Sequence, residues 1–384
     1  MDFQLSEEQE MIRQAARDFA VNECLPGVIE RDEKQKFPHE QVMKLADLGF
    51  LGMMVSPEYG GAGLDTISYV LAMEEISKVD ASTSVCMSVN NSLVCFGIEA
   101  YGTEEQKKKY LVPLAQGKKD GELYLGAFLL SEPEAGSDAT SQRTTAEEKD
   151  DHYLINGVKN WITNGNSASV YLVFAQTHVE KGSHGINVFL VEKSWPGVKV
   201  GAKENKLGIR GSDTHSISFT DVKVPKENRI GPDGFGFKFA MQTLSGGRIG
   251  IASQALGLAS GAMERAIAYS KERKAFGTEI KNHQIIQFKL ADMATKVDAA
   301  RLLCFRAAWQ KDKKQDYTVS AAMAKVFSSE TAIWVTSEAI QIHGGYGYVK
   351  EYHVERMMRD AKITQIYEGT SEMQRIVIGR GLLK

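Results

Sequence analysis

The stretches VYLVFA (170–175), INVFLVE (186–192) and HSISFTDVKV (215–224) decide the fold class that we predict. All three are rich in β-branched and aromatic residues and lie between turn residues. Short strands that follow one another without helices between them predict an antiparallel sheet, closed as a barrel or stacked as a sandwich. The pair Asn156-Gly157, flanked by apolar residues, predicts a hairpin because both turn positions of that type require positive φ.

Helical periodicity precedes and follows this β region. In the N-terminal part, apolar residues from Met11 to Ala20 recur at helical spacing behind a Ser6–Gln9 capping box, and Thr103 with Gln106 indicates a second box. After Phe235, apolar stripes longer than an average helix predict a bundle. We therefore predict an α+β protein with an all-α domain over residues 1–121, a β domain over 122–231 and a C-terminal four-helix bundle over 232–384.

Bulk composition narrows the class of protein. A chain of 384 residues can hold two or three domains, and a mixed net charge of −3 argues against nucleic acid as a partner. No apolar run approaches the ~20 residues that cross a bilayer, and the acidic N-terminus lacks signal-peptide features. Cys24, Cys86, Cys95 and Cys304 form no CxxC pair, which predicts free thiols in a reducing compartment. We expect a cytoplasmic protein, with a processed mitochondrial matrix protein as the alternative.

Common catalytic signatures are missing from the sequence. It contains no GxxxxGK[ST] loop, no HExxH motif, no GxSxG elbow and no Cys/His cluster at metal-ligand spacing. A P-loop NTPase, a metalloenzyme and a serine hydrolase are therefore disfavoured, and no metal site is expected.

Three segments carry unusual polar or glycine residues, each with an ordinary structural explanation. The loop Ser131–Asp138 offers hydroxyls and small residues, although a plain surface connection is the more common reason for such a loop. Gly344–Gly347 follows a helical stripe and lacks the third glycine, so it fails as a Rossmann fingerprint and resembles a helix C-cap. Trp161, in a strand, is most simply a core residue.

The segment Tyr367–Glu372 interrupts a helical pattern near the C-terminus. Ser371 with Gln374 has the spacing of a helix cap, which places Glu368 and Gly369 at the break between two helices. Gly369 lacks a Cβ where another group can approach closely. From the residues alone, a solvated Glu368 is the more common outcome than a catalytic one.

Five stretches in order resemble the acyl-CoA dehydrogenase family, and the resemblance covers essentially the whole chain. They are LLSEPEAGSDA (129–139), NWITNG (160–165), RKAFG (273–277), QIHGGYGY (341–348) and RDAKITQIYEGTSEMQ (359–374). The short-chain, butyryl-CoA branch is the most similar, through SGGRIGIASQALG (245–257) and QFKLADM (287–293). Taken together, the motifs are far more specific than any one of them.

The resemblance implies FAD held without a covalent bond between the β domain and the C-terminal helices. Phe128, Leu130 and Ser131 would contact the flavin, and Trp161 and Thr163 would flank its ring. Another group would reach the FAD of a neighbouring subunit in a homotetramer, a dimer of dimers: Arg273, Phe276, Gln284, Gln341, Ile342, His343, Gly344 and Gly345. The remaining FAD contacts implied are Leu129, Ile162, Thr370, Ser371 and Glu372.

The same resemblance implies Glu368 as the base that removes the α proton of an acyl-CoA. Hydride transfer from the β carbon to flavin N5 would give the trans-2-enoyl-CoA, and the electrons would pass to electron-transfer flavoprotein. Burial of Glu368 should raise its pKa towards the working pH. The thioester ligand would contact Ser137, Ser245, Gly246, Gly247, Arg248, Tyr367 and Gly369.

Three positions refine this expectation. Some members of the family carry the base at the position of Gly247, and glycine cannot serve, so Glu368 is the only candidate. Glutaryl-specific members carry an arginine where this chain has Ser84, so a dicarboxylic substrate is disfavoured. Close short-chain relatives have an aspartate where this chain has Ser245, and the contacts to pantetheine are therefore open.

Two other functions stay in view. An acyl-CoA oxidase of the same fold would return electrons to O₂, and peroxide formed without another acceptor would distinguish it. A non-catalytic flavoprotein that binds a partner or DNA is the third alternative, although basic patches are not evident in this mildly acidic chain.

Overall fold

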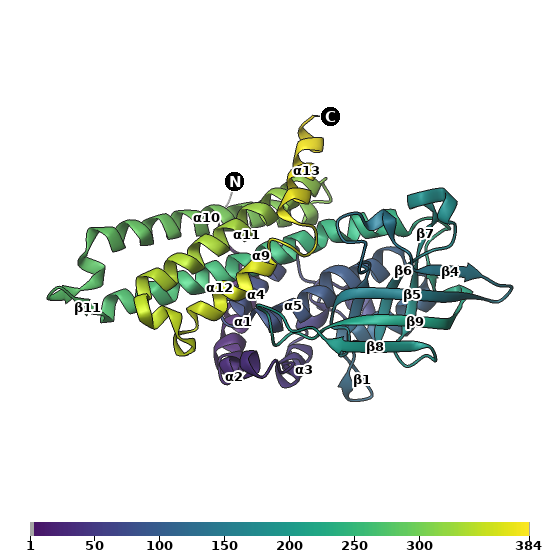
Figure 1. The fold of residues 1–384 in the computed structure, drawn as a ribbon, viewed down its shortest axis with the longest axis horizontal. Coiled ribbons are helices and arrows are strands. Elements are labelled where there is room, and N and C mark those ends of the chain that lie inside the picture. The colour runs from purple at the N-terminus through teal and green to yellow at the C-terminus, as the bar shows by residue number, and fades with distance from the viewer. Residues whose placement is uncertain (1–3, 384) are drawn as a thin grey trace.

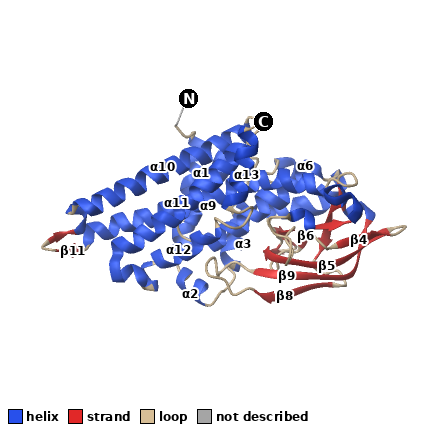
Figure 2. Ribbon diagram, turned by 45° about the horizontal axis from the view of Figure 1, so that its top comes forward, coloured by secondary structure: helices blue, strands red, loops and turns tan. Residues whose placement is uncertain are grey.

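The computed structural model describes residues 4–383, and its eight-stranded sheet and its long helices lie towards opposite ends of an elongated molecule (Figure 1). Figure 2 shows the strands of the sheet gathered beside the helices, whereas the short strand β11 lies at the far end of the helices. The helix α9 (Gly236–Glu272) links the two parts, since its first turns pack on the sheet and its last turn reaches the far end. The predicted order of helical, β and helical domains is confirmed.

The N-terminal helical domain contains, in its described part, eight α-helices interrupted by three π-helical turns. Both predicted capping boxes are present, at Ser6 with Gln9 and at Thr103 with Gln106. The α-helices are α1 (Glu7–Phe19), α2 (Val28–Glu33), α3 (His39–Asp47), α4 (Thr66–Ser77), α5 (Ala81–Ser88), α6 (Phe96–Tyr101), α7 (Glu104–Gln106) and α8 (Val112–Gln116). The π-helical turns are η1 (Ala20–Cys24), η4 (Val89–Cys95) and η5 (Lys107–Leu111).

The middle domain is a mixed sheet rather than the predicted antiparallel barrel or sandwich. Its strand order is β10-β7-β6-β4-β5-β9-β8, with β3 pairing with β6 in parallel. Parallel pairing is possible here because the chain passes through β4 and β5 between these two strands, so no tight hairpin has to join them. The strands are β3 (Gly126–Leu129), β4 (Thr145–Glu148), β5 (His152–Thr163), β6 (Val170–Gln176), β7 (Ile186–Glu192), β8 (Val198–Lys203), β9 (Thr214–Pro225) and β10 (Arg229–Ile230).

The hairpin predicted at Asn156-Gly157 is wrong. β5 continues through both residues, and its register with β9 shifts between Ile155 and Gly157, which marks a β-bulge. Gly157 is required there because a Cβ would collide with Thr144, and its φ of 148° suits glycine. The Asn-Gly pair therefore lies in a β-bulge, where glycine lets Thr144 approach closely, and not in a two-residue turn.

The C-terminal domain is the predicted helical bundle, with a fifth helix beside it. The long helices α9, α10 and α11 pack on one another, and the shorter α12 packs on α11 and α9. α4 from the N-terminal domain also packs on α9 and α10, so the two helical domains share one core. The bounds not yet given are α10 (Gln284–Asp312), α11 (Thr318–His343), α12 (Val354–Ile363) and α13 (Ser371–Leu382).

Short elements complete the chain. Two-stranded hairpins are formed by β1 (Lys118–Lys119) with β2 (Glu122–Leu123) and by β11 (Lys274–Ala275) with β12 (Thr278–Glu279). The 3₁₀ turns are η2 (Phe50–Gly52), η3 (Pro57–Tyr59), η6 (Ala139–Ser141), η7 (Val179–Gly185), η8 (Lys226–Asn228), η9 (Ile280–Asn282), η10 (Gly344–Tyr348) and η11 (Lys350–Tyr352). All four cysteines are buried and free, as predicted. Among residues 4–383 no helix has the length and apolarity that crossing a membrane requires.

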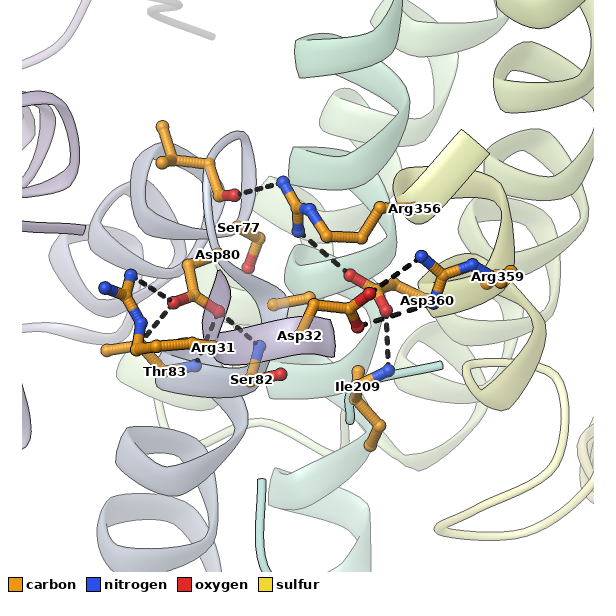
Figure 3. Close-up of polar contacts among 12 residues, drawn as sticks. Arg31, Asp32, Ser77, Asp80, Ser82, Thr83, Ile209, Arg356, Arg359 and Asp360 are labelled. Carbon is orange, nitrogen blue, oxygen red and sulfur yellow. Dashed lines mark hydrogen bonds and ion pairs between the residues drawn. The ribbon is translucent and has the colours of Figure 1, made fainter. Parts of the chain in front are cut away.

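A buried polar network joins the three domains at α12 (Figure 3). The Asp360 carboxylate accepts the Ile209 N–H of the middle domain at 2.5 Å and pairs with Arg356 at 3.1 Å. Arg359 pairs with Asp32 of the N-terminal domain at 2.8 Å. Burial raises the pKa of Asp360 to about 6 despite the Arg356 charge. Because α12 leads directly into the segment that carries Glu368, this junction sets where that segment lies.

Candidate active site

Glu368 lies in the connection between α12 and α13, at the predicted helix break. Glu368 and Gly369 both have left-handed backbone, with φ of 51° and 92°. The side chain of Gln374 stabilises this shape, because its amide N–H donates to the carbonyls of Glu368 (3.3 Å) and Gly369 (2.8 Å). Left-handed φ at a non-glycine residue is uncommon and is concentrated at functional sites.

The helix cap lies one residue earlier than predicted. Thr370, with extended backbone, accepts the Met373 N–H at its side-chain oxygen, whereas Ser371 is already the first residue of α13. The predicted cap at Ser371 is therefore wrong. The Ser371 N–H donates instead to the Gln365 carbonyl, which ties the start of α13 back to the preceding turn.

Glu368 as a whole is partly buried. Its Oε2 atom is buried and has no hydrogen-bond partner among the described residues. It lies beside Gly247 and near Leu93. Burial raises the pKa of Glu368 to about 7, while the positive charges of Lys325 and Arg248 act in the opposite direction. A carboxylate with these properties is suited to accept a proton near neutral pH.

Helix α9 supplies the wall opposite Glu368. The Arg248 side chain is buried, with one guanidinium N–H 3.5 Å from Ser245 Oγ and its Nε unpaired among the described residues. Ser245 Oγ donates to the Met241 carbonyl of the same helix at 3.0 Å. The predicted ligand residues Gly247, Arg248, Tyr367 and Gly369 are thus brought close to Glu368, whereas Ser137 is exposed on its loop.

A chain of buried polar groups holds Tyr367 next to Glu368. The Tyr367 hydroxyl donates to Gln254 Oε1, and the Gln254 amide donates to the Ala81 carbonyl (2.8 Å) and Ser84 Oγ (3.3 Å). Ser77 donates to Ser84 Oγ at 2.8 Å. Sequence reasoning missed Gln254, whose position within an apolar helical stripe was the available signal.

The π-helical turn η4 is the second feature that the sequence did not reveal. It packs on β3 on one side and on α9 on the other. The Asn90 amide donates to the Leu51 (2.8 Å) and Leu114 (3.0 Å) carbonyls, and its Oδ1 accepts the Gly126 N–H at 3.0 Å. π-Helical turns are rare and often occur at functional sites. Two consecutive asparagines in an apolar helix were the signal for this one.

The residues expected to meet a flavin ring lie at the ends of β3 and β5. Ser131 accepts the Asn160 N–H at 2.9 Å, which joins the two strand ends. Trp161 has left-handed φ of 62° at a bulge and is 60% exposed, so it is not the core residue that its strand position suggested. Leu129 and Ile162 are buried, and Phe128 and Thr163 are partly buried. An exposed indole beside small polar groups fits a planar aromatic cofactor.

A buried ion pair supports the segment that carries these expected flavin contacts. Lys159 is completely buried and donates to Glu132 Oε1 (2.8 Å), Gln142 Oε1 (3.0 Å) and the Leu130 carbonyl (3.1 Å). Glu132 also accepts the Thr144 N–H at 3.0 Å. Burial lowers the pKa of Lys159 to about 8, against the opposing effect of Glu132.

A second group of predicted cofactor residues lies at the far end of the helical domain, near β11 (Figure 1). Arg273, Gln284 and Gln341 are exposed, and Phe276 is 98% exposed at the tip of the β11–β12 hairpin. Ile342 and His343 are buried. Gly344 caps α11 with φ of 60°. A Cβ added at Gly344 or at Gly345 would meet no other atom within 4 Å. Within one chain these residues do not join the site around Glu368.

The remaining predicted contacts lie on α13 and α9. Thr370 is partly buried, Ser371 is buried and Glu372 is exposed. A Cβ added at Gly246 would meet the Ser92 carbonyl and the Tyr317 hydroxyl at ordinary contact distance.

Known proteins match the chain along its whole length. Three models match it in order: the acyl-CoA dehydrogenase N-terminal domain over residues 6–118, the middle domain over 127–222 and the C-terminal domain over 234–383. The chain belongs to the acyl-CoA dehydrogenase family. Members of this family are FAD-dependent oxidoreductases, and the exposed Trp161 beside the ends of β3 and β5 fits that cofactor.

Individual relatives place the chain near the short-chain branch. It is 51% identical over 378 residues to a short-chain specific acyl-CoA dehydrogenase of Clostridium acetobutylicum, covering 98% of each chain. The solved butyryl-CoA dehydrogenase of Megasphaera elsdenii superposes with a TM-score of 0.97 at 49% identity, covering 100% of each chain. A structure described as an electron transferring flavoprotein of Acidaminococcus fermentans contains a chain with a TM-score of 0.97 at 50% identity, again covering 100% of each.

Proposed function

We propose that the protein oxidises a short-chain acyl-CoA, such as butyryl-CoA, to the trans-2-enoyl-CoA. The observation that carries the proposal is the buried, unpaired Oε2 atom of Glu368 beside Gly247, in a carboxyl group whose pKa is raised to about 7. A base with that pKa is ionised in about half of the molecules at neutral pH and still accepts a proton readily.

The protein's own residues orient the thioester and move the proton. Glu368 takes the α proton at its carboxylate, and the Glu368 backbone N–H is the donor that we assign to the thioester carbonyl. Hydrogen bonding at that oxygen stabilises the charge that develops as the proton leaves. The Gln374 amide donates to the carbonyls of Glu368 and Gly369 and so fixes the peptide geometry at Glu368. FAD, when bound, accepts the hydride that leaves the β carbon.

Bulky side chains around Glu368 support a short acyl group. The Tyr69 hydroxyl bonds Ser88 Oγ at 2.9 Å, and both atoms occupy the space beside Gly250 where a side chain would lie. Tyr367 fills the other side through its bond to Gln254. Ser84, already bonded to Ser77 and Gln254, offers no positive charge to a second carboxylate, which argues against a dicarboxylic acyl group.

Partners and assembly follow the same proposal. Electrons would leave to electron-transfer flavoprotein, and a homotetramer would bring the Phe276 end of one subunit to the FAD of another. The exposure of Phe276, Arg273 and the Gly344–Gly345 turn supports that arrangement. The residues named for FAD and acyl-CoA keep the roles given above as part of this proposal.

An anaerobic titration of the flavin absorbance with acyl-CoAs of four, six and eight carbons tests the function. We expect bleaching with the four-carbon substrate at the lowest concentration, and enoyl-CoA formed in a 1:1 ratio to reduced flavin. An absence of bleaching with every acyl-CoA would refute the proposal. Peroxide formed in step with substrate in air, without added electron-transfer flavoprotein, would indicate an oxidase instead.

A further inference from the structure

Helix α11 places a buried lysine directly behind the segment that carries Glu368. Lys325 has no exposed surface, and its Nζ donates to the Gly369 carbonyl at 2.7 Å. Among the described residues no carboxylate lies within ion-pair distance of this ammonium group. A buried lysine without an ion-pair partner lowers the stability of the fold, so we expect such a residue to have a function.

The Lys325 bond acts on the strained part of the Glu368 segment. Gly369 has φ of 92°, and its carbonyl is held from two sides, by Lys325 and by Gln374 at 2.8 Å. The preceding peptide is held through the Glu368 carbonyl. The left-handed pair 368–369 is therefore fixed by two side chains that belong to different helices, α11 and α13.

Lys325 also contributes charge to the site. The titratable and charged groups that face Glu368 are Lys325 from α11, Arg248 from α9, Tyr69 from α4 and its neighbour Tyr367. Of these, Lys325 has the largest opposing effect on the raised pKa of Glu368, ahead of Arg248. The Arg248 guanidinium group already donates to the Ser245 side chain. Lys325 donates to the Gly369 backbone carbonyl and, within residues 4–383, to no side chain.

We propose that Lys325 is a positioning residue for the proposed dehydrogenation, which orients the Glu368–Gly369 backbone and places a positive charge behind the Glu368 carboxylate. It does not touch the substrate. Its hydrogen bond sets the geometry of the base, and its charge sets the pH at which the base works. The inference rests on the proposed function of Glu368 as that base.

The test compares the pH dependence of anaerobic flavin reduction by butyryl-CoA in the holoenzyme and two variants. Lys325→Met removes the bond and the charge, whereas Lys325→Gln removes the charge and keeps a donor for the Gly369 carbonyl. We expect the acid limb to move up by about 1 pH unit in both variants. The maximal rate at high pH should fall further in the methionine variant than in the glutamine variant.

A matched control separates this role from the ordinary effect of removing a buried lysine. Lys78, which pairs with Glu75 and Glu264 away from the site, is 12% exposed in its side chain. Lys78→Met should lower stability and leave the acid limb in place. An acid limb unchanged in both Lys325 variants would overturn the inference. Loss of FAD from both variants would also overturn it, because Lys325 would then be needed only for the fold. If wild-type protein fails to bleach, the proposed function itself fails, so the two failures are distinguishable.

Discussion

The carboxylate of Glu368 occupies the space beside the Gly247 α-carbon where a side chain at that position would lie. A Cβ at Gly247 would overlap Glu368 Oε2 and press on Leu93. Glycine is therefore needed at position 247 to leave space for the Glu368 carboxylate. A side chain at position 247 and the Glu368 carboxylate in its present place therefore exclude one another.

Gly247→Ala should displace the Glu368 carboxylate while FAD stays bound. A misplacement of about 1 Å in a catalytic group costs roughly 100-fold in rate, so we expect a loss of that order in the rate of flavin reduction. Rapid-mixing measurements under anaerobic conditions check this. Gly379→Ala on α13, where a new Cβ meets nothing within 4 Å, is the control and should react at the wild-type rate. Equal rates for the two variants would contradict the packing relationship.

The raised pKa of Glu368 predicts that its function costs stability at high pH. Because the folded-state pKa lies above the unfolded value, the Glu368 contribution to stability is present below about 4.5 and is lost as the pH rises through about 7. Glu368→Gln, which stays neutral, should exceed the wild-type stability at pH 8 by ~1–3 kcal/mol and match it closely at pH 4. Urea unfolding of both proteins at the two pH values checks this. A stability difference that does not change with pH would refute the burial of this carboxyl.

The buried ion pair between Lys159 and Glu132 should be costly to break. Lys159→Met leaves the Glu132 carboxylate buried without its cation, and we expect a loss of ~3–5 kcal/mol in the free energy of unfolding. The double variant Lys159→Met with Glu132→Gln should recover part of that loss. Lys149→Met, which removes an exposed pair with Glu147, should cost less than ~1 kcal/mol. If the buried and exposed variants lose equal stability, the segment does not depend on the pair.

Helical elements were predictable because their signals are local. The capping boxes at Ser6 and Thr103 and the glycine cap at Gly344 each depend on residues within a few positions of each other. The bulge at Gly157 was not predictable, because the same Asn-Gly pair suits a hairpin. Only the approach of Thr144, which directly precedes β4, decides between the two.

The site was predictable only in part, for a related reason. The break at Glu368 follows from the local pattern, but the burial of its carboxyl depends on Gly247 and Lys325, which are 121 and 43 positions away in the sequence. We predicted Trp161 to be a core residue because it lies in a strand. Its left-handed backbone at a bulge turns the indole outward instead. The mixed sheet likewise depends on β3, whose pairing partner lies beyond two other strands.

The most direct test of the central claim is the anaerobic mixing of butyryl-CoA with wild-type protein and with Glu368→Gln, followed by the flavin absorbance. Both proteins should be yellow, since a glutamine side chain has nearly the size and shape of the glutamate that it replaces. The account predicts rapid bleaching of the wild type and none in the variant on the same timescale. Bleaching of Glu368→Gln at a rate near that of the wild type would contradict the assignment of Glu368 as the base.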